Sequence, residues 1–190
     1  MSAFFFLTRN DKSVFRKLVL LALLFSWIGD VVLLFQEQHS NFFLIRLVSF
    51  LIAHIFYILA FRKTSLSRST TLLKEKPLLV LLFIAYGAGF FFLIKDGLGT
   101  MMVPVIVYMA IILLMGITAL NRFRRVGYDS FILVFTGAIC FMASDSLLAM
   151  NKFYMPFPLS GFFIMLTYIA AQYLIVRGSW RQIASGSATD

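Results

Sequence analysis

Two aspartates lie in stretches that are otherwise as apolar as the interior of a membrane. Asp30 lies in FSWIGDVVLLF (residues 25–35), and Asp145 lies in GAICFMASDSLLAM (residues 137–150). A charge at the centre of a membrane helix costs about 2.5–3.5 kcal/mol on insertion scales, so such a residue normally faces the interior of a helix bundle. Two carboxylates in different environments can divide acid/base work, because one can hold a proton while the other stays ionised. Asp30 and Asp145 are therefore the candidate catalytic residues.

The composition indicates an integral membrane protein. Of the 190 residues, 61% are hydrophobic and 13% are charged, and the mean hydropathy is +0.93. Soluble domains are about 45–50% apolar, and this chain could not cover its surface with polar groups in water. The predicted fold class is all-α, a polytopic transmembrane helix bundle that forms one domain.

Six segments are apolar enough for spanning helices, which need roughly 20 residues each. They are residues 18–35, 42–61, 77–94, 101–120, 131–150 and 157–176. The bundle is therefore expected to cover residues 18–176. Residues 1–17 are expected to form a cytoplasmic N-terminal segment, and residues 177–190 a cytoplasmic polar tail.

Lysine and arginine are distributed unequally between the two sides of this predicted bundle. The side that carries the termini has 14 of the 17, and the other side has only Arg46, Lys95 and Lys152. By the positive-inside rule, the first side is cytoplasmic. We therefore expect a multi-pass protein of the cell (inner) membrane with both termini in the cytoplasm. Arg46 is expected to extend its charged end toward the outer interface.

The sequence also narrows the range of partners and cofactors. The net charge of +9 comes from loops beside the spans, so attraction to anionic lipid head groups explains it, and no nucleic-acid partner is expected. Cys140 is the only cysteine, and His39 and His54 are the only histidines. A Cys-rich or three-His zinc site is therefore impossible, and we expect no metal and no cofactor. The oligomeric state remains open.

The two aspartates are predicted to lie at nearly the same depth. With a rise of about 1.5 Å per residue, Asp30 lies ~18 Å from the inner end of its span and Asp145 ~21 Å from the inner end of its own. His54, in the inward-running second span, lies ~18 Å from the outer end of that span. These polar residues converge on one band of the membrane, which predicts a shared interior pocket.

Six further polar residues are candidates to bind substrate or to support the aspartates. Two pairs among them are three or four residues apart and therefore share a helix face, and two others lie close to Asp145 in the sequence. The candidates are His54, Tyr57, Ser144, Asn151, Tyr168 and Gln172. Each also has a purely structural interpretation, as a hydrogen-bonded residue of the bundle interior.

Two stripes of small residues occur at four-residue spacing. One consists of Thr136, Cys140 and Ser144, and the other of Ala85 and Gly89. Small side chains let membrane helices approach closely. We interpret both stripes as packing surfaces.

Four segments of the chain resemble the YhhN-like lysoplasmalogenase family. In order, they are LLALLFSWIGDVVLLF, SFLIAHIFYILAF, FTGAICFMASDSLLAMNKF and YIAAQYLIV. They contain G-D, A-H-x-x-Y, S-D-x-x-L-A and Y-x-x-x-Q, a combination that is fairly specific. The resemblance covers about residues 20–177. Members usually have about eight spans, whereas this chain shows six; the other two would precede residue 18.

The resemblance implies a membrane hydrolase of lysoplasmalogens, which are lysophospholipids with one alkenyl ether chain. The expected products are a fatty aldehyde and glycerophosphocholine or glycerophosphoethanolamine, and the expected partners are this substrate and membrane lipids. The family positions carried over to this chain are Asp30, His54, Tyr57, Asp145, Asn151, Tyr168 and Gln172.

Vinyl ether hydrolysis begins with protonation of an alkenyl carbon and proceeds through an oxocarbenium ion that water attacks. Glycosidases handle a similar cation with two carboxylates. We therefore predict that Asp30 and Asp145 form an acid/anion pair. His54, Tyr57 and Tyr168 would orient water or stabilise the leaving oxygen.

Two other functions remain open. Intramembrane Asp, His and Tyr side chains also form proton relays, as in a proton-coupled small-molecule transporter. Against this alternative, no two segments resemble inverted repeats. A non-catalytic protein that binds lysolipid in the polar pocket is the second alternative.

Overall fold

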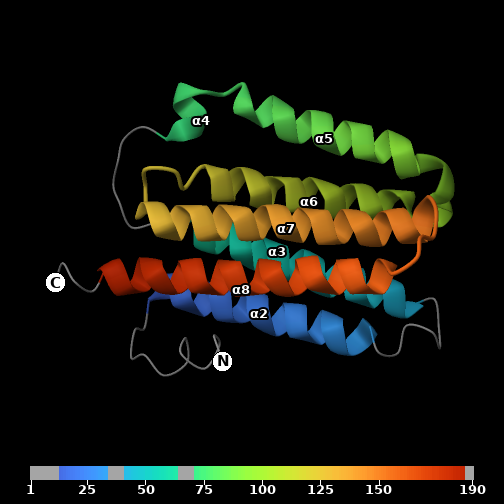
Figure 1. The fold of residues 1–190 in the computed structure, drawn as a ribbon, viewed down its shortest axis with the longest axis horizontal. Helices are drawn as coiled ribbons and strands as arrows, with labels where there is room; N and C mark the ends of the chain where they lie inside the picture. Colours follow the sequence, from blue (N-terminus) through green and yellow to red (C-terminus); the bar gives the residue numbers. More distant parts are fainter. Residues whose placement is uncertain (1–12, 34–40, 64–70, 187–190) are drawn as a thin grey trace.

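The computed structural model describes residues 13–33, 41–63 and 71–186, and the regular structure of these residues is helical throughout. The long helices lie roughly side by side along one axis (Figure 1). They are α2 (Val14–Leu33), α3 (Asn41–Arg62), α5 (Leu79–Ile94), α6 (Met102–Leu120), α7 (Tyr128–Phe153) and α8 (Ser160–Gly186). The short helix α4 (Leu72–Glu75) precedes α5, and the 3-10 turns η1 (Lys95–Gly97) and η2 (Gly99–Met101) connect α5 to α6. The prediction of an all-α polytopic bundle is confirmed.

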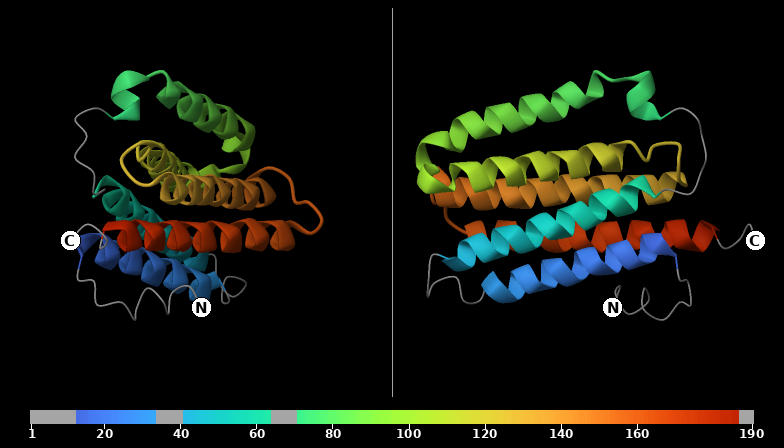
Figure 2. Two further views of the ribbon diagram at one scale, coloured as in Figure 1. Left: turned by 60° about the vertical axis from the view of Figure 1, so that its left-hand side comes forward. Right: turned by 180° about the vertical axis from the view of Figure 1, so that it is seen from behind.

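Five of the described helical segments are long and apolar enough to cross a membrane. They correspond to the second to sixth predicted spans. Helix α2 lies where the first span was predicted, but its 20 residues include Arg16, Lys17 and Asp30. A helix of this length measures about 30 Å, the thickness of a bilayer core, and α2 packs along α3 (Figure 2). A crossing by α2 therefore remains a prediction that its length and position support.

Helix α8 continues beyond the predicted end of its span, from Val176 to Gly186, into the predicted polar tail. Polar contacts with α7 and the preceding loop stabilise this extension. Ser130 donates a hydrogen bond to the carbonyl oxygen of Gly178 at 2.7 Å, and Arg122 Nη2 donates to Gln182 Oε1 at 2.5 Å. Arg122 is 1% exposed, and burial lowers the pKa of its guanidinium to about 9. Residues 187–190 of the predicted tail lie outside the described residues.

The helices are arranged around a core between α3, α6, α7 and α8. Helices α7 and α8 pack against each other, α6 packs against α3 and α7, and α5 lies on the outside beside α6 (Figures 1 and 2). We call the end at which α3 begins and α7 ends the outer end, following the predicted orientation. The polar residues discussed below lie between this end and the middle of the bundle.

The close approach of α7 and α8 depends on small residues, but not on the full predicted stripe. Ser144 is buried and donates to the carbonyl oxygen of Ile164 at 3.0 Å, whereas Thr136 is exposed and its neighbour Gly137 is buried. On α5, Ala85 and Gly89 are both exposed, so the predicted stripe makes no packing contact within this chain, and packing by it against a second chain stays a prediction. Gly87 takes that role instead: a Cβ at Gly87 would lie 2.5 Å from Leu113 Cδ1. The four-residue spacing of small residues in the sequence therefore did not identify the face of α5 that is buried.

Gly137→Val is expected to destabilise the α7–α8 pair. A Cβ at Gly137 would lie 2.9 Å from the backbone oxygen of Ala171 and 3.0 Å from the backbone nitrogen of Ile175, so the helices would have to separate. Overpacking of this kind lowers the free energy of unfolding by about 1–3 kcal/mol. Thermal unfolding in detergent measures the effect. Gly89→Val is the control, because no atom lies within 4 Å of a Cβ at that position; equal unfolding temperatures for the two variants would contradict the expectation.

Candidate active site

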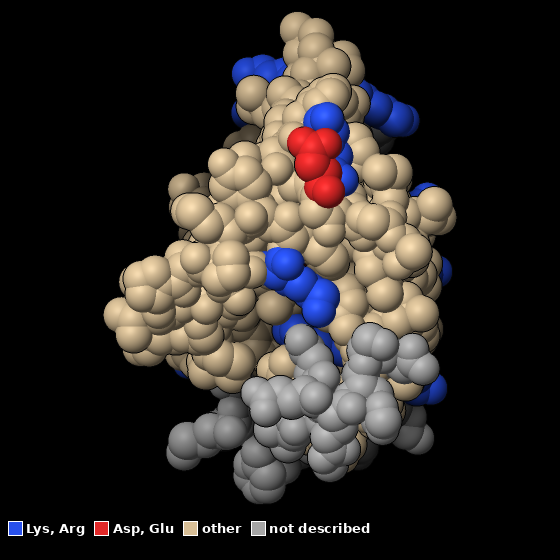
Figure 3. Space-filling view, turned by 90° about the vertical axis from the view of Figure 1, so that its right-hand side faces the viewer, with Lys and Arg blue, Asp and Glu red and all other residues tan. Residues whose placement is uncertain are grey.

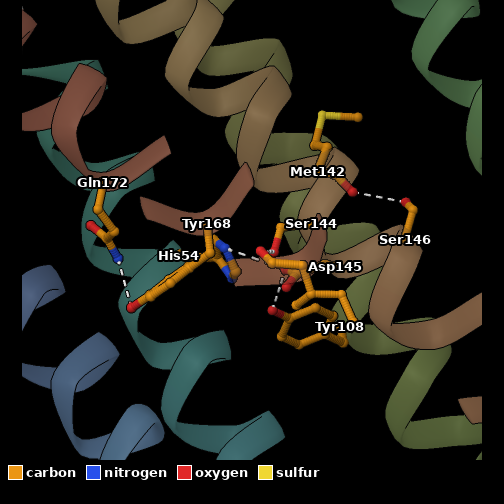
Figure 4. A network of polar contacts seen from close by, with 9 residues as sticks. His54, Tyr108, Met142, Ser144, Asp145, Ser146, Tyr168 and Gln172 are labelled. Carbon is orange, nitrogen blue, oxygen red and sulfur yellow. Dashed lines mark hydrogen bonds and ion pairs between the residues drawn. The ribbon is translucent and has the colours of Figure 1, made fainter. Parts of the chain in front are cut away.

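Asp145 of α7 lies where side chains from two other helices converge on its carboxylate (Figure 4). Tyr108 of α6 donates a hydrogen bond from its hydroxyl to Asp145 Oδ2 at 2.6 Å. His54 of α3 places Nε2 3.9 Å from the same oxygen. The Asp145 side chain is 15% exposed and that of His54 is fully buried. Three helices thus bring a carboxylate, a phenol and an imidazole to one point.

His54 is packed among aromatic rings, and the backbone carbonyl of Phe50, one turn earlier on α3, lies near its ring. Its ring packs edge-on against Tyr108 and Phe141, with centroid distances of 5.4 and 4.6 Å. Neither ring nitrogen has a hydrogen-bond partner among the described residues. Leaving a buried polar group unsatisfied costs about 1–3 kcal/mol, and a separation above 3.5 Å is suited to a bridging water.

Asp30 belongs to a second polar group, which joins α2, α8 and α3. Tyr168 donates a hydrogen bond to Asp30 Oδ2 at 2.8 Å, and Gln172 Nε2 donates to the Tyr168 hydroxyl at 3.3 Å. Tyr57 in turn donates to Gln172 Oε1 at 2.7 Å. Four of the predicted site residues therefore form one chain of hydrogen bonds.

The two carboxylates accept hydrogen bonds from different tyrosines. Between the two groups lies Phe141, whose ring centroid is 4.6 Å from that of His54 and 5.5 Å from that of Tyr168. Asp145 lines two cavities, and Asp30 lines neither of them. The two aspartates thus have separate sets of hydrogen-bond partners: Asp145 lines two of the described cavities, and Asp30 belongs to a chain of hydrogen bonds that joins three helices.

Arg46 lies near the outer end of α3 but is buried within the chain, and its charged group does not extend to the surface as expected. It is 7% exposed, and its guanidinium carbon lies 5.5 Å from the ring centroid of Phe50. Its charge interacts with both Asp30 and Asp145 at longer range. The reason is its helix face: Arg46, Phe50 and His54 are spaced by four residues on α3, so Arg46 shares the inward face of His54. That spacing was the sequence signal that could have identified it.

Ser144 and Asn151, two other predicted site residues, have structural partners. Ser144 joins α7 to α8 through the hydrogen bond described above, and Asn151 Oδ1 accepts from the backbone N–H of Phe157 at 3.2 Å. Sequence reasoning missed Tyr108, the direct partner of Asp145. It also missed Tyr86, whose hydroxyl lies 2.6 Å from the Ser146 hydroxyl beside Asp145.

Three cavities follow one another past Asp145. The outer cavity, of about 40 Å³, lies between α3, α6 and α7. The central cavity, also of about 40 Å³, lies between α5, α6 and α7 and shares Tyr108 and Asp145 with the outer one. The apolar groove, of about 440 Å³, lies farther from the outer end between the same three helices and shares Tyr86 and Met142 with the central cavity. Asp145 therefore stands at the junction of the first two spaces.

The sequence profile described as the YhhN family matches residues 1–179 of the chain. The chain belongs to the YhhN family. The resemblance seen in four sequence segments is thereby confirmed.

Three curated relatives of this YhhN family chain carry the name lysoplasmalogenase. Lysoplasmalogenase TMEM86A of Bos taurus is 35% identical over 160 residues, and that of Homo sapiens is 33% identical over 163 residues; each match covers 83% of this chain and 62% of the relative. Lysoplasmalogenase TMEM86B of Homo sapiens is 29% identical over 160 residues, which cover 84% of this chain and 62% of the relative. The chain thus spans less than two thirds of the length of these relatives. No solved structure matches the chain.

The candidate site of this family member contains no cluster of metal ligands in the part of the chain that the structure describes. No three His, Cys, Asp or Glu side chains come together there.

Proposed function

We propose that this YhhN family protein is a membrane hydrolase that cleaves the vinyl ether bond of lysoplasmalogens. The observation that carries the proposal is the position of Asp145, which lines two neighbouring cavities and has His54 and Tyr108 beside it. The names of its curated relatives support the same substrate class. The products are a fatty aldehyde and a glycerophospho head group such as glycerophosphocholine or glycerophosphoethanolamine.

In the proposed mechanism, Asp145 donates a proton to the alkenyl carbon farther from the ether oxygen. The carbon attached to that oxygen becomes an oxocarbenium ion, and the carboxylate left behind stabilises its charge. Water adds to the cation, and His54 accepts the proton that this water releases. The resulting hemiacetal then breaks its bond to the glycerol oxygen, which takes up the proton held by His54, while the hemiacetal hydroxyl gives its proton to Asp145 and the aldehyde leaves. One water is consumed for each ether cleaved.

Asp30 has a different part in this proposal from that of Asp145. It lines neither cavity that Asp145 lines, and its carboxylate is held by Tyr168. We assign it the role of a second negative charge. It acts on the site at longer range through Arg46, whose positive charge interacts with both Asp30 and Asp145. Tyr57, Tyr168 and Gln172 position this charge and fix α2, α3 and α8 around the site.

The orientation of the bundle is part of the proposal. The excess of lysine and arginine on the side of the termini supports cytoplasmic termini in the cell (inner) membrane. In this orientation the outer cavity lies toward the side of the membrane opposite the cytoplasm. An accessibility assay with cysteine substitutions at the two ends of α7 would measure the orientation.

The activity is tested with purified protein in detergent. A lysoplasmalogen and a lysophospholipid with a saturated ether chain of the same length are each incubated with the protein, and aldehyde and head group are measured by mass spectrometry. Turnover of the vinyl ether alone is the expected result. Absence of aldehyde would contradict the proposal.

The same preparation separates the two alternative functions from hydrolysis. Flux that occurs only in sealed proteoliposomes, without product in detergent, would identify a proton-coupled transporter. Thermal stabilisation by lysolipid without product would identify a non-catalytic lysolipid-binding protein.

A further inference from the structure

Arg46 is a buried cation, and the described residues offer it no ion pair. Two of its guanidinium nitrogens, Nε and Nη1, are buried and have no hydrogen-bond partner among the described residues. Burying a charge without pairing it costs several kcal/mol, so buried charges are normally paired. Arg46 lines the outer cavity. An anion that enters this cavity would supply the missing hydrogen bonds.

Lys152 adds a second positive charge at the same place. Its Nζ lies 4.0 Å from the ring centroid of Phe43 and 6.0 Å from that of Phe153, and both rings line the outer cavity. Arg46 and Lys152 come from α3 and α7, which lie on either side of this cavity. The outer end carries basic groups near the middle of its surface, separate from its acidic group (Figure 3). Arg46 on α3 and Lys152 on α7 therefore place two positive charges beside the outer cavity.

The spacing between these cations and Asp145 matches the layout of a lysophospholipid. Lys152 is seven residues after Asp145, which is ~10 Å along the helix axis. Arg46 is eight residues before His54, which is ~12 Å along α3, and the long arginine side chain covers part of that distance. In a lysophospholipid, a short glycerol backbone separates the phosphate from the ether. A phosphate beside Arg46 would leave the ether bond near Asp145.

We propose that Arg46, assisted by Lys152, binds the phosphate of the substrate head group and makes a phosphorylated alkenyl lipid the preferred substrate over an alkenylglycerol. This inference rests on the proposed function. A guanidinium donates paired hydrogen bonds that fit a phosphate, and a partly dehydrated site strengthens them. The chemistry recognised is that of a phosphate group, which a lipid or free inorganic phosphate can supply.

The kinetic test compares a lysoplasmalogen with an alkenylglycerol of the same chain, which lacks the phosphate. The measured quantity is the ratio of the two kcat/KM values, because general damage to the site affects both substrates. Arg46→Gln is expected to lower this ratio about 10- to 100-fold, as loss of a charged hydrogen-bonding group does. Lys95→Gln is the control, since Lys95 lies at the same end but pairs with Asp96 on the surface. An unchanged ratio in Arg46→Gln would overturn the inference.

Two further variants keep the test decisive if Arg46→Gln does not fold. Arg46→Lys retains the charge but loses the paired geometry, and it is expected to recover only part of the wild-type ratio. Lys152→Gln changes a side chain exposed at the outer end, and it is expected to lower the ratio about threefold, as an exposed charge does. Wild-type ratios in both variants would overturn the inference.

A binding experiment separates this inference from the proposed hydrolase activity. Thermal stabilisation is measured with a saturated-ether lysophospholipid, with the corresponding alkylglycerol and with inorganic phosphate. The lysophospholipid is expected to stabilise the wild type more than the alkylglycerol does, and Arg46→Gln should remove the difference. If this result holds but no aldehyde forms from a lysoplasmalogen, the hydrolase proposal fails and the phosphate site stands. Another outcome is that inorganic phosphate stabilises the protein in an Arg46-dependent way while the two lipids stabilise it equally. That result would assign the site to free phosphate and not to a lipid head group, and it would overturn the inference.

Discussion

Asp145→Asn is expected to reduce kcat for aldehyde release from a lysoplasmalogen by about 10²–10⁴-fold, the usual contribution of a general acid. The amide has nearly the shape of the carboxyl group, and its oxygen can still accept the hydrogen bond from Tyr108. It cannot, however, transfer a proton to carbon. KM should therefore change little. Initial rates measured with purified variant and wild type in detergent give both constants.

Asp30→Asn is the matched comparison, since it makes the same chemical change in the other intramembrane carboxylate. We expect a smaller loss of kcat, because Asp30 lines neither the outer nor the central cavity and acts at a distance. Asp96→Asn provides a surface control. Full activity in Asp145→Asn would remove the proposed acid, and a larger loss in Asp30→Asn than in Asp145→Asn would exchange the roles of the two residues.

The positions of the helices were predictable because hydropathy and charge determine them. A span must be apolar over about 20 residues, so the ends of α6 at Met102 and Leu120 differ little from the predicted 101–120. The end of α8 was not predictable in this way. Its last turns carry polar residues, and the contacts of Arg122 and Ser130 that hold them come from parts of the chain 48 or more residues away.

The grouping of the polar residues was predictable only within each helix. Spacing of three or four residues correctly placed Tyr168 with Gln172 on one face, and these two residues do hydrogen-bond. Equal depth then suggested that Asp30 and Asp145 share a pocket. Depth along the membrane does not specify the rotation of each helix, and the structure gives the two aspartates different tyrosine partners.

Arg46 shows why burial was the hardest property to predict. A positive charge one or two turns from a helix end can reach water by extending its side chain, and this general tendency led to the expected surface position. Whether Arg46 is buried instead depends on what the inward face of α3 packs against. In the structure it meets a cavity that also contains Asp145, and a site for an anion becomes possible.

The three cavities lie in the same order as the three parts of a lysoplasmalogen. The outer cavity contains the cation, Asp145 stands at the junction with the central cavity, and the apolar groove begins beyond Met142. A substrate with its ether at Asp145 and its phosphate toward Arg46 would direct its hydrocarbon chain along the central cavity into the groove. Each methylene buried there would contribute about 0.8 kcal/mol to binding. Long-chain substrates should therefore depend on the groove, and short-chain substrates should not.

Ala143→Trp is expected to lower kcat/KM for a long-chain lysoplasmalogen by about 100-fold, equivalent to the loss of three to four buried methylenes. Ala143 lines the groove, whose volume of about 440 Å³ admits an indole ring, so the tryptophan should fill the groove without separating the helices. A substrate whose chain ends in the central cavity should retain its kcat/KM. Both constants are measured on the same purified variant.

Ala110→Trp is the control for this prediction, because it introduces the same side chain on the exposed face of α6, away from the residues that line the three cavities. It should leave both substrates unaffected. Equal losses for long and short chains in Ala143→Trp would mean that the tryptophan disturbs Asp145 itself, two residues along α7, and the groove would then have no part in binding the chain. A lower kcat/KM for the long-chain substrate alone would indicate that its chain lies in the groove while its ether lies at Asp145. Only a ligand that occupies both places at once would depend on the two together.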